Sequence, residues 1–226
     1  MHRTNEFTEH FMRDGTVPTA GNSGSIFGKT ITGDATAVYK GGVSGATGVL
    51  ELALAATSEI ENACVSMADK LHFDIANINS VEFRARLAVA LGTTAATTQV
   101  AFGLTGNRNA TIDSIAQNLL FRVLGDAAGG VIVESDDGTT DKDDVATGIT
   151  LGTDWKNFII DFRQGGVRDV RFFGQGSRGL VRIGTGTVFD MSAYTGGLQF
   201  FAQIQKAANT DLGTLQIDRF TVNFRE

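Results

Sequence analysis

Two pairs of carboxylates have the spacing in this chain that comes nearest to catalytic chemistry. Glu59 and Glu61 lie two positions apart, as do Glu134 and Asp136, and on a strand this spacing places both side chains on one face. A retaining glycosidase needs an acid and a nucleophile about 5 Å apart. Nothing beside either pair completes such a set, and carboxylates that are exposed ordinarily face water. We therefore expect both pairs to be solvated.

An acidic stretch between residues 134 and 144 is the candidate for a metal site. Ca²⁺ takes roughly six to eight oxygen ligands, and this stretch is rich in them. It lacks the ligand order of an EF-hand, because no Glu occupies the last position of such a loop. The candidate calcium ligands are Asp136, Asp137, Asp141, Asp143 and Asp144. We predict no other metal and no cofactor.

Other catalytic motifs are absent from the sequence. His2, His10 and His72 do not have the spacing of a zinc site. The single cysteine, Cys64, lies in a strand-like run and is expected to be a small buried residue. No nucleophile elbow and no phosphate-binding loop is present. We therefore expect that the chain is not an enzyme.

Arginines gather around glycine-rich turns between residues 163 and 182. Arg favours bidentate carboxylate contacts and is enriched in interfaces, so we assign Arg168, Arg171 and Arg178 to a partner-binding surface. Asp161 and Asp169 are close enough in the sequence to pair with some of these arginines. Ordinary surface ion pairs, which contribute little to stability, are the alternative.

Composition restricts the class of protein. The chain has 226 residues, a net charge of −6 and a hydrophobic fraction of 42%, which suits a globular domain. Clustered cations are missing, so nucleic-acid binding is disfavoured. No apolar run is long enough for a membrane span, and no apolar signal segment is present. We expect a protein that stays in the cytoplasm or in particles assembled there.

Residues 1–48 differ in composition from the rest of the chain. The segment is rich in Gly, Ser and Thr, and its apolar residues are isolated singles and pairs that cannot form a core alone. We predict an extended arm over residues 1–48 and a β-sandwich over residues 49–226. The arm residues expected to anchor on a partner are Phe7, Phe11, Ile26, Phe27, Val38 and Tyr39.

Apolar and polar residues alternate in many short runs from residue 49 onward. The clearest runs cover residues 50–54, 81–89, 99–104, 119–124, 131–134, 155–162, 169–173 and 180–183. Ser58 and Glu61 match a capping box, so a helix over 59–68 competes with a strand there, and we favour the strand. Short strands separated by Gly-rich turns are typical of a β-sandwich or jelly roll. The predicted fold class is all-β, with two antiparallel sheets.

The C-terminal stretch, residues 198–226, shows the strongest alternation. Leu198, Phe200 and Ile204 share one phase, and a polar connection leads to a second run that ends at Phe224. The phase of this second run slips at Asp218-Arg219, which predicts a β-bulge. We expect the two runs to form the closing antiparallel pair of a sheet.

The same stretch resembles a known family. Gly197-Leu198-Gln199, Lys206-Ala207 and the run GTLQIDRF at 213–220 resemble the close of concanavalin-like jelly rolls in virion proteins of tailed phages. More distantly, they are similar to laminarinase-type glycosidases and laminin-G-like modules. The resemblance covers roughly residues 50–226 and implies a concanavalin-like jelly roll with an N-terminal arm. The Glu-x-Asp-x-x-Glu motif of the laminarinase type is missing.

The resemblance implies a non-enzymatic virion structural protein. We predict a capsid decoration protein that binds and stabilises the phage head shell through its arm and one face of the sandwich. Its partners would be the major capsid protein or other virion proteins, and sister copies in a trimer or dimer, at the capsid surface of particles assembled in the host cytoplasm. The alternatives are a lectin-like carbohydrate-binding module of a tail or fibre, and then a glycosidase-like enzyme. A glycan binder usually offers an aromatic platform, and this chain has one Trp and two Tyr.

Overall fold

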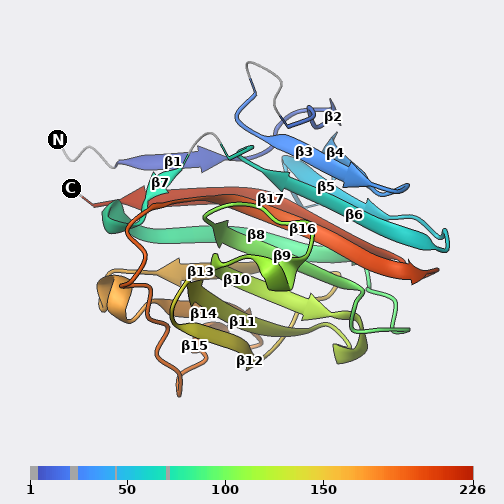
Figure 1. The fold of residues 1–226 in the computed structure, drawn as a ribbon. Coiled ribbons are helices and arrows are strands. Elements are labelled where there is room, and N and C mark those ends of the chain that lie inside the picture. Colours follow the sequence, from blue (N-terminus) through green and yellow to red (C-terminus); the bar gives the residue numbers. More distant parts are fainter. Residues whose placement is uncertain (1–4, 21–24, 44, 70–71, 226) are drawn as a thin grey trace.

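Two antiparallel β-sheets packed face to face make up the molecule (Figure 1). A computed structural model describes residues 5–20, 25–43, 45–69 and 72–225. Over these residues the only helical segments are short 3₁₀ turns: η1 (Ile75–Asn77), η2 (Ile112–Ser114), η3 (Gly125–Ala127) and η4 (Gly166–Arg168). No described helix has the length and apolar character needed to cross a membrane. The predicted all-β sandwich is confirmed.

One sheet has nine strands within the described residues. In spatial order they are β15 (Gly179–Ile183), β14 (Arg171–Gly176), β13 (Lys156–Asp161), β8 (Ile78–Val89), β17 (Gly213–Phe224), β5 (Gly48–Leu54), β4 (Thr36–Gly41) and β2 (Gly15–Thr16), with β1 (Glu6–Glu9) also paired to β17. Long alternating strands occupy its centre, and the shortest of the main series, β2, lies at an edge.

The other sheet has eight strands in the described part of the chain. In spatial order they are β12 (Asp141–Thr150), β11 (Gly130–Asp137), β10 (Gln117–Leu124), β9 (Gln99–Thr105), β16 (Gly197–Asn209), β6 (Glu59–Ser66) and β3 (Gly28–Thr32), with β7 (Phe73–Asp74) paired to the start of β16. Because strand side chains alternate between faces, each strand of this sheet contributes one row to the core and one row to the outer face.

The two C-terminal strands are not paired with each other, contrary to the prediction. β16 is central in the eight-stranded sheet, and β17 is central in the nine-stranded sheet. The short connection at residues 210–212 therefore crosses from one sheet to the other. The predicted β-bulge is confirmed, because the pairing of β17 with β8 shifts register between Ile217 and Arg219.

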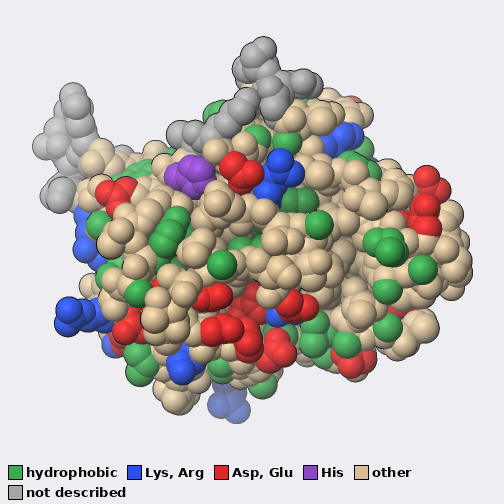
Figure 2. Space-filling model, in the orientation of Figure 1, with side chains coloured by type: hydrophobic (Ala, Val, Ile, Leu, Met, Phe, Trp, Pro, Cys, Tyr) green, Lys and Arg blue, Asp and Glu red, His purple; other side chains and the backbone are tan. Residues whose placement is uncertain are grey.

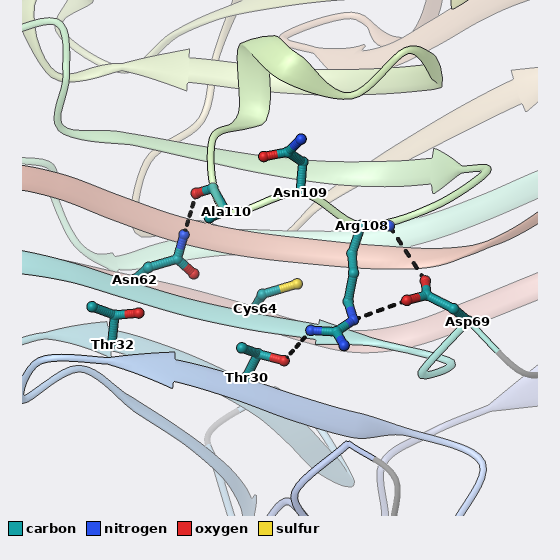
Figure 3. Close-up of a pocket in the computed structure, with 8 residues that line it drawn as sticks. All are labelled: Thr30, Thr32, Asn62, Cys64, Asp69, Arg108, Asn109 and Ala110. Atoms are coloured by element: carbon teal, nitrogen blue, oxygen red, sulfur yellow. Dashed lines mark hydrogen bonds and ion pairs between the residues drawn. The ribbon is translucent and has the colours of Figure 1, made fainter.

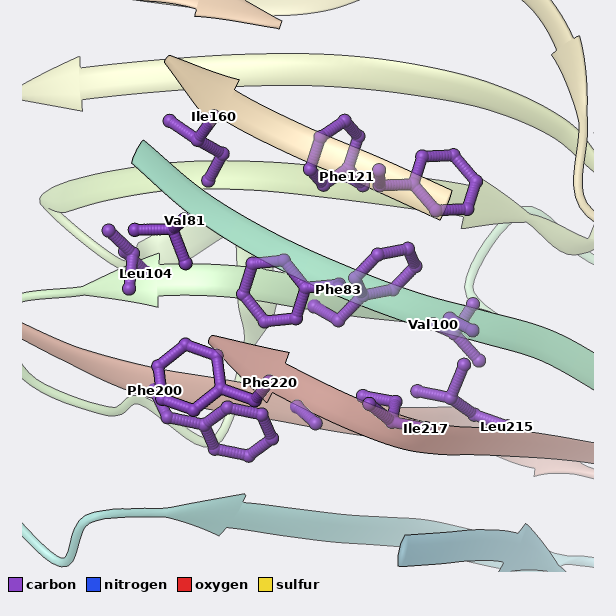
Figure 4. Packing of buried hydrophobic residues seen from close by; sticks show 14 of the residues in the cluster. Val81, Phe83, Val100, Leu104, Phe121, Ile160, Phe200, Leu215, Ile217 and Phe220 are labelled. Atoms are coloured by element: carbon purple, nitrogen blue, oxygen red, sulfur yellow. The ribbon is translucent and has the colours of Figure 1, made fainter. Parts of the chain in front are cut away.

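Aromatic rings fill the space between the sheets (Figure 4). The rings of Phe200 and Phe220, one from each sheet, have centroids 4.9 Å apart, and those of Phe83 and Phe102 are 5.7 Å apart. Six large apolar side chains of the alternating strands are fully buried: Phe158, Ile160, Phe200, Ile204, Leu215 and Ile217. Burial of each such side chain contributes about 1.5–3 kcal/mol as an upper range.

The N-terminal segment is part of the sandwich and not a separate arm. β1 pairs with β17, β2 and β4 extend the nine-stranded sheet, and β3 extends the eight-stranded sheet. Gly41 of β4 pairs with Gly48 of β5, so the predicted domain boundary at residue 48 falls within a pair of adjacent strands. Figure 1 shows β1 lying beside the C-terminal strand.

Three of the predicted partner anchors are core residues of this chain. Phe11, Phe27 and Tyr39 are buried, and the Phe11 ring lies 5.5 Å from Phe27 and 6.0 Å from Phe200 between centroids. Their assignment to a partner is therefore wrong, because each fills the interior of its own fold. Among the other anchors, Phe7 and Val38 are half-buried and Ile26 is exposed.

Candidate functional site

One loop covers the outer face of the eight-stranded sheet. This covering loop (residues 106–116) joins β9 to β10 and includes η2. Ile112 and Ile115 of the loop are buried in a small apolar cluster with Phe201 of β16 and other outward side chains of the sheet. The loop is also fixed by polar contacts, since the Ile112 N–H donates to Gln205 Oε1 at 3.3 Å. A hollow lies on each side of the covering loop.

The first hollow, which we name the Arg108 hollow, has a volume of about 300 Å³ (Figure 3). It is lined by Thr30 and Thr32 of β3, Asn62 and Cys64 of β6, Asp69 of the turn after β6, and Arg108, Asn109 and Ala110 of the covering loop. Its volume is at the lower end of the range for small-ligand sites, roughly 300–1,000 Å³.

Asp69 and Arg108 form the polar wall of this hollow. The Arg108 Nε donates to Asp69 Oδ2 at 3.0 Å, the backbone N–H of Arg108 donates to Asp69 Oδ1 at 3.3 Å, and Nη1 of Arg108 contacts the Thr30 hydroxyl. The two side chains are each 33% exposed, so water and ligand reach the pair. This geometry fixes the plane of the guanidinium and leaves its Nη2 without a hydrogen bond to the described residues.

Gln199 of β16 holds the Asp69 turn in place. Its Nε2 donates to Asp69 Oδ1 at 2.5 Å and to the Gly106 carbonyl at 3.1 Å, while its Oε1 accepts the Asp69 N–H at 3.2 Å. Gln199 is fully buried. Asp69 and Ala68 both have φ in the left-handed region, 55° and 58°, which is costly for Ala. The sheet therefore orients the carboxylate through a buried amide and a strained turn.

Asn62 forms the opposite side of the hollow. Its Nδ2 donates to the Ala110 carbonyl at 2.6 Å, and Gln203 Nε2 donates to the same carbonyl at 3.0 Å. The Asn62 Oδ1 and the Thr32 hydroxyl have no hydrogen bond to another described residue. Together with Arg108 Nη2, they give the hollow one acceptor, one hydroxyl and one charged donor that are available to a ligand.

Cys64 forms the floor of the hollow and is 4% exposed, as expected for a small buried residue. Burial raises the pKa of its thiol to about 12, with a smaller opposing effect of Arg108. The thiol therefore stays protonated at neutral pH and is a poor nucleophile.

The second hollow, which we name the Arg122 hollow, has a volume of about 470 Å³ and is acidic. Arg122 of β10 is 4% exposed and contacts the buried Glu134 and the exposed Asp113. Burial raises the pKa of Glu134 to about 7, against the opposing effect of Arg122. Asp113, Asp141, Asp143 and Asp144 also line this hollow, so one cation faces several carboxylates. Figure 2 shows acidic side chains gathered on this part of the face and basic side chains nearer β3.

The predicted carboxylate pairs are not assembled for catalysis. Glu61 is fully buried, its Oε1 lies 3.3 Å from Nζ of the buried Lys206, and its Oε2 accepts the Ala55 N–H at 2.7 Å. Glu59 accepts the Asp34 N–H at 2.9 Å and fixes a turn. The expectation that both pairs are solvated is wrong for Glu61, which is buried against Lys206, and for Glu134, which is buried against Arg122.

The calcium candidates belong to two adjacent strands, β11 and β12, and none of them lies in the turn between these strands. Asp137 is buried at the end of β11, and its carboxylate accepts the N–H groups of Thr139, Thr140 and Ala193 at 2.6–3.0 Å. Asp141, Asp143 and Asp144 lie on the edge strand β12. Among the described residues, no three His, Cys, Asp or Glu side chains are grouped to hold a metal ion. The structure therefore does not bring the five predicted ligands together.

The three predicted interface arginines lie on or between strands of the nine-stranded sheet. Arg171 pairs with Asp169, with Nη2 to Oδ2 at 3.0 Å, as the alternative of a surface ion pair expects. Arg168 ends η4 and Arg178 lies in the turn between β14 and β15, and both are exposed. These arginines are not part of either hollow.

Of the residues that line the Arg108 hollow, the sequence singled out only Cys64. Thr30, Asn62, Asp69 and Arg108 come from separate segments, so no local motif connects them. One signal was present: Asn62, Cys64 and Ser66 alternate with apolar residues, which indicates a polar outer row on that strand.

Comparison with solved structures shows the fold. No family model and no curated protein sequence matches the chain. A protein of unknown function, SO2946 from Shewanella oneidensis MR-1, is similar with a TM-score of 0.57 and 12% identity, over 98% of this chain and 87% of that one. The carbohydrate recognition domain of Emp47p is similar with a TM-score of 0.53 and 10% identity, over 93% and 95% of the two chains.

The fold is a concanavalin-like jelly roll. A conserved carbohydrate esterase, vb_24B_21 from the Shiga toxin-encoding bacteriophage phi24B, is also similar, with a TM-score of 0.50 and 11% identity over 95% of this chain and 98% of that one. At these identities the likeness concerns the fold, and activity has to be argued from the site. The predicted concanavalin-like jelly roll is confirmed.

Proposed function

We propose that this jelly roll binds a carbohydrate in the Arg108 hollow. The observation that carries the proposal is the set of fixed polar groups there that remain available: Asn62 Oδ1, the Thr32 hydroxyl and Arg108 Nη2. Neighbouring hydroxyls of a sugar ring each donate and accept hydrogen bonds, so a rigid mixture of donors and acceptors suits them. The carbohydrate recognition domain of Emp47p, which shares the fold, supports this choice of ligand.

The affinity for one sugar unit should be low. None of the described residues that line the hollow is aromatic, so they do not offer the stacking that strengthens many glycan sites. Trp155 lies elsewhere, where its ring is covered by Arg84 and Arg86 at 5.0 and 4.6 Å from the centroid. We expect a dissociation constant of about 1 mM for a single sugar, which corresponds to about −4 kcal/mol.

A glycan array followed by calorimetry tests the proposal. Wild-type protein should bind at least one class of glycan, and Asn62→Ala and Arg108→Ala should each weaken that binding about tenfold, because each removes a directional or charge-assisted hydrogen bond. Arg163→Ala is the matched control, since Arg163 pairs with Asp161 on the other sheet at 2.9 Å.

All variants should keep the wild-type circular dichroism spectrum and melting temperature within a few degrees. The proposal is abandoned if no glycan binds, or if binding occurs and both hollow variants bind as well as Arg163→Ala.

The second candidate function is that of a non-enzymatic structural protein of a phage virion. The similar phage esterase supports a phage origin, and the exposed Arg168 and Arg178 offer a surface for shell proteins. Decoration stabilises a shell by linkage, about 2.7 kcal/mol per site at a hundredfold excess over Kd. Phage particles that lack the protein should then break at a lower temperature, and re-added wild-type protein should restore their stability. The double variant Arg168→Ala, Arg178→Ala should restore less of it. This candidate is rejected if particles without the protein and particles to which it has been added back break at the same temperature.

A further inference from the structure

A groove at the edge of β3 adjoins the Arg108 hollow. This groove, which we name the Lys29 groove, has a volume of about 620 Å³, and it shares Thr30 and Arg108 with the hollow. Its lining residues are Thr16, Thr19, Ala20, Lys29, Thr30, Ile31, Ala35, Thr36, Ala37, Val38 and Arg108. A ligand seated in the hollow therefore has a continuous path over Arg108 toward β2 and β4.

The groove has a fixed backbone around Lys29. The Lys29 N–H donates to the Pro18 carbonyl at 2.7 Å, and the Ala20 N–H donates to the Lys29 carbonyl at 2.9 Å. These bonds place residues 18–20 alongside the edge strand. The position of the Lys29 side chain along the groove is thus set by the sheet and does not depend on a free loop end.

The charge of the groove is positive in a protein of net charge −6. Lys29 and Arg108 are its only charged lining residues in the described part of the chain. Asp69 balances Arg108, whereas no ion pair or hydrogen bond among the described residues involves the Lys29 ammonium. One positive charge is therefore left for a ligand.

The opposite side of the covering loop has the reverse charge. The Arg122 hollow carries Asp113, Asp141, Asp143 and Asp144 around one buried arginine. An anionic ligand would be repelled there and attracted to the Lys29 groove, so the charge pattern of this face gives a bound chain a direction. The effect acts locally, because the Debye length at physiological salt is about 8 Å.

We propose that the carbohydrate bound by this protein is an anionic oligosaccharide that extends from the Arg108 hollow into the Lys29 groove. One sugar unit occupies the hollow, and the carboxylate, sulfate or phosphate group of a following unit lies beside Lys29 and Arg108 Nη2. The proposal rests on the proposed function and adds to it the charge of the ligand and the direction in which it runs.

Calorimetry with matched oligosaccharides tests the proposal. The probes are a uronate oligosaccharide, its neutral methyl ester, and a neutral oligosaccharide of equal length with and without a single sulfate or phosphate. For wild-type protein at low salt, each acidic form should bind about fivefold more tightly than its neutral counterpart, the size expected for one partly exposed ion pair. Raising the salt to 0.5 M should remove most of the difference.

Lys29→Gln should remove most of the preference for the acidic form, because Arg108 is already balanced by Asp69, and should leave the affinity for the neutral form unchanged. Lys142→Gln is the matched control, because Lys142 is a half-buried lysine on β12 at the opposite edge of the same sheet. It should keep the preference. If only the uronate is preferred over its neutral counterpart, the anionic group of the ligand is a carboxylate. If only the sulfated or phosphorylated form is preferred, the anionic group is a sulfate or a phosphate.

Two negative outcomes are distinguishable. If neutral and acidic forms bind equally in wild type, or if Lys29→Gln keeps the full preference, the ligand is not selected by charge here, and carbohydrate binding itself still stands. If neither form binds, the proposed function fails and this inference fails with it.

Discussion

The turn at Ala68 and Asp69 shows how single residues set up the candidate site. Both residues have a left-handed backbone, and only Asp69 is of a type that tolerates this conformation well. Gln199 and Arg108 donate hydrogen bonds to the Asp69 carboxylate. These bonds hold the turn in its strained conformation at the wall of the hollow. Backbone strain that persists beside fixed polar groups is a feature of binding sites.

Ala68→Gly should stabilise the protein by roughly 0.5–1 kcal/mol. Removal of the left-handed strain gains about 1–2 kcal/mol, and the added freedom of Gly in the unfolded chain offsets about 0.4–1 kcal/mol of it. Urea unfolding measures the change. Ala53→Gly, on the regular strand β5, is the control and should destabilise, and a destabilised Ala68→Gly would show that the turn is not strained.

Asp211 is a second residue whose surroundings predict a measurable effect. Burial would raise the pKa of its carboxyl, but hydrogen bonds from Thr94 and Thr98, at 2.5 and 2.7 Å, outweigh burial and hold the pKa below its ordinary value. A lowered folded-state pKa adds stability that is present above the unfolded-state pKa and is lost as the pH falls through the folded-state value.

The free energy of unfolding should therefore decrease from pH 7 to pH 3 in both proteins, and the decrease should be larger for the wild type than for Asp211→Asn. Urea unfolding at the two pH values measures both differences, and Asp126→Asn, an exposed change in η3, should behave as wild type. Equal losses in wild type and Asp211→Asn would contradict the role given to the hydrogen bonds.

At the scale of elements, the N-terminal strands decide how the sandwich is closed. Phe11 lies between β1 and β2, has φ of 50°, and packs against Phe27 and Phe200. Phe11→Ala should cost about 3–5 kcal/mol, because it leaves a cavity where the buried ring packs against the core. Met12→Ala changes the neighbouring side chain, which is 68% exposed, and should cost under 0.5 kcal/mol. Equal effects of the two changes in thermal unfolding would place Phe11 outside the core.

Alternation in the sequence predicted most strands but not which of them pair. It located most strands from residue 49 onward because period-two burial is visible in a single run, as at Val81 to Val89, but it missed β12 in and after the acidic stretch. It could not separate a hairpin from a crossing between sheets, so β16 and β17 were placed together. The N-terminal strands were missed because they are short, and because the large buried side chains Phe11 and Phe27 stand outside them.

The candidate site was largely beyond prediction for a related reason. The Arg108 hollow joins Asp69 to Arg108 across 39 positions, and Thr30 to Arg108 across 78. The types of these residues are ordinary for loops and outer rows, so only the folded sheet reveals that they converge. The acidic stretch, which stood out in the sequence, is a strand edge whose charges discourage pairing with other chains.

For the whole molecule, removal of residues 1–48 should prevent folding. The deletion takes β1, β2, β3 and β4 from both sheets and exposes the core that Phe11, Phe27 and Tyr39 cover. The sequence alone suggested a folded remainder after this deletion, and the structure predicts the opposite. Near-ultraviolet circular dichroism and amide dispersion in NMR spectra should be lost. Deletion of residues 1–4, which leaves every described strand intact, is the control.

The pairing of β1 with β17 has a consequence for synthesis in the cell. Thr8 and Thr221, whose hydroxyl oxygens lie 3.0 Å apart, are separated by 213 positions. At about 5–20 residues per second, a ribosome makes the second of them about ten to forty seconds after the first. Both sheets also lack a central strand until β16 and β17 have been made. The nascent chain must therefore be protected from aggregation through most of its translation, and the sandwich closes only near the end of that time.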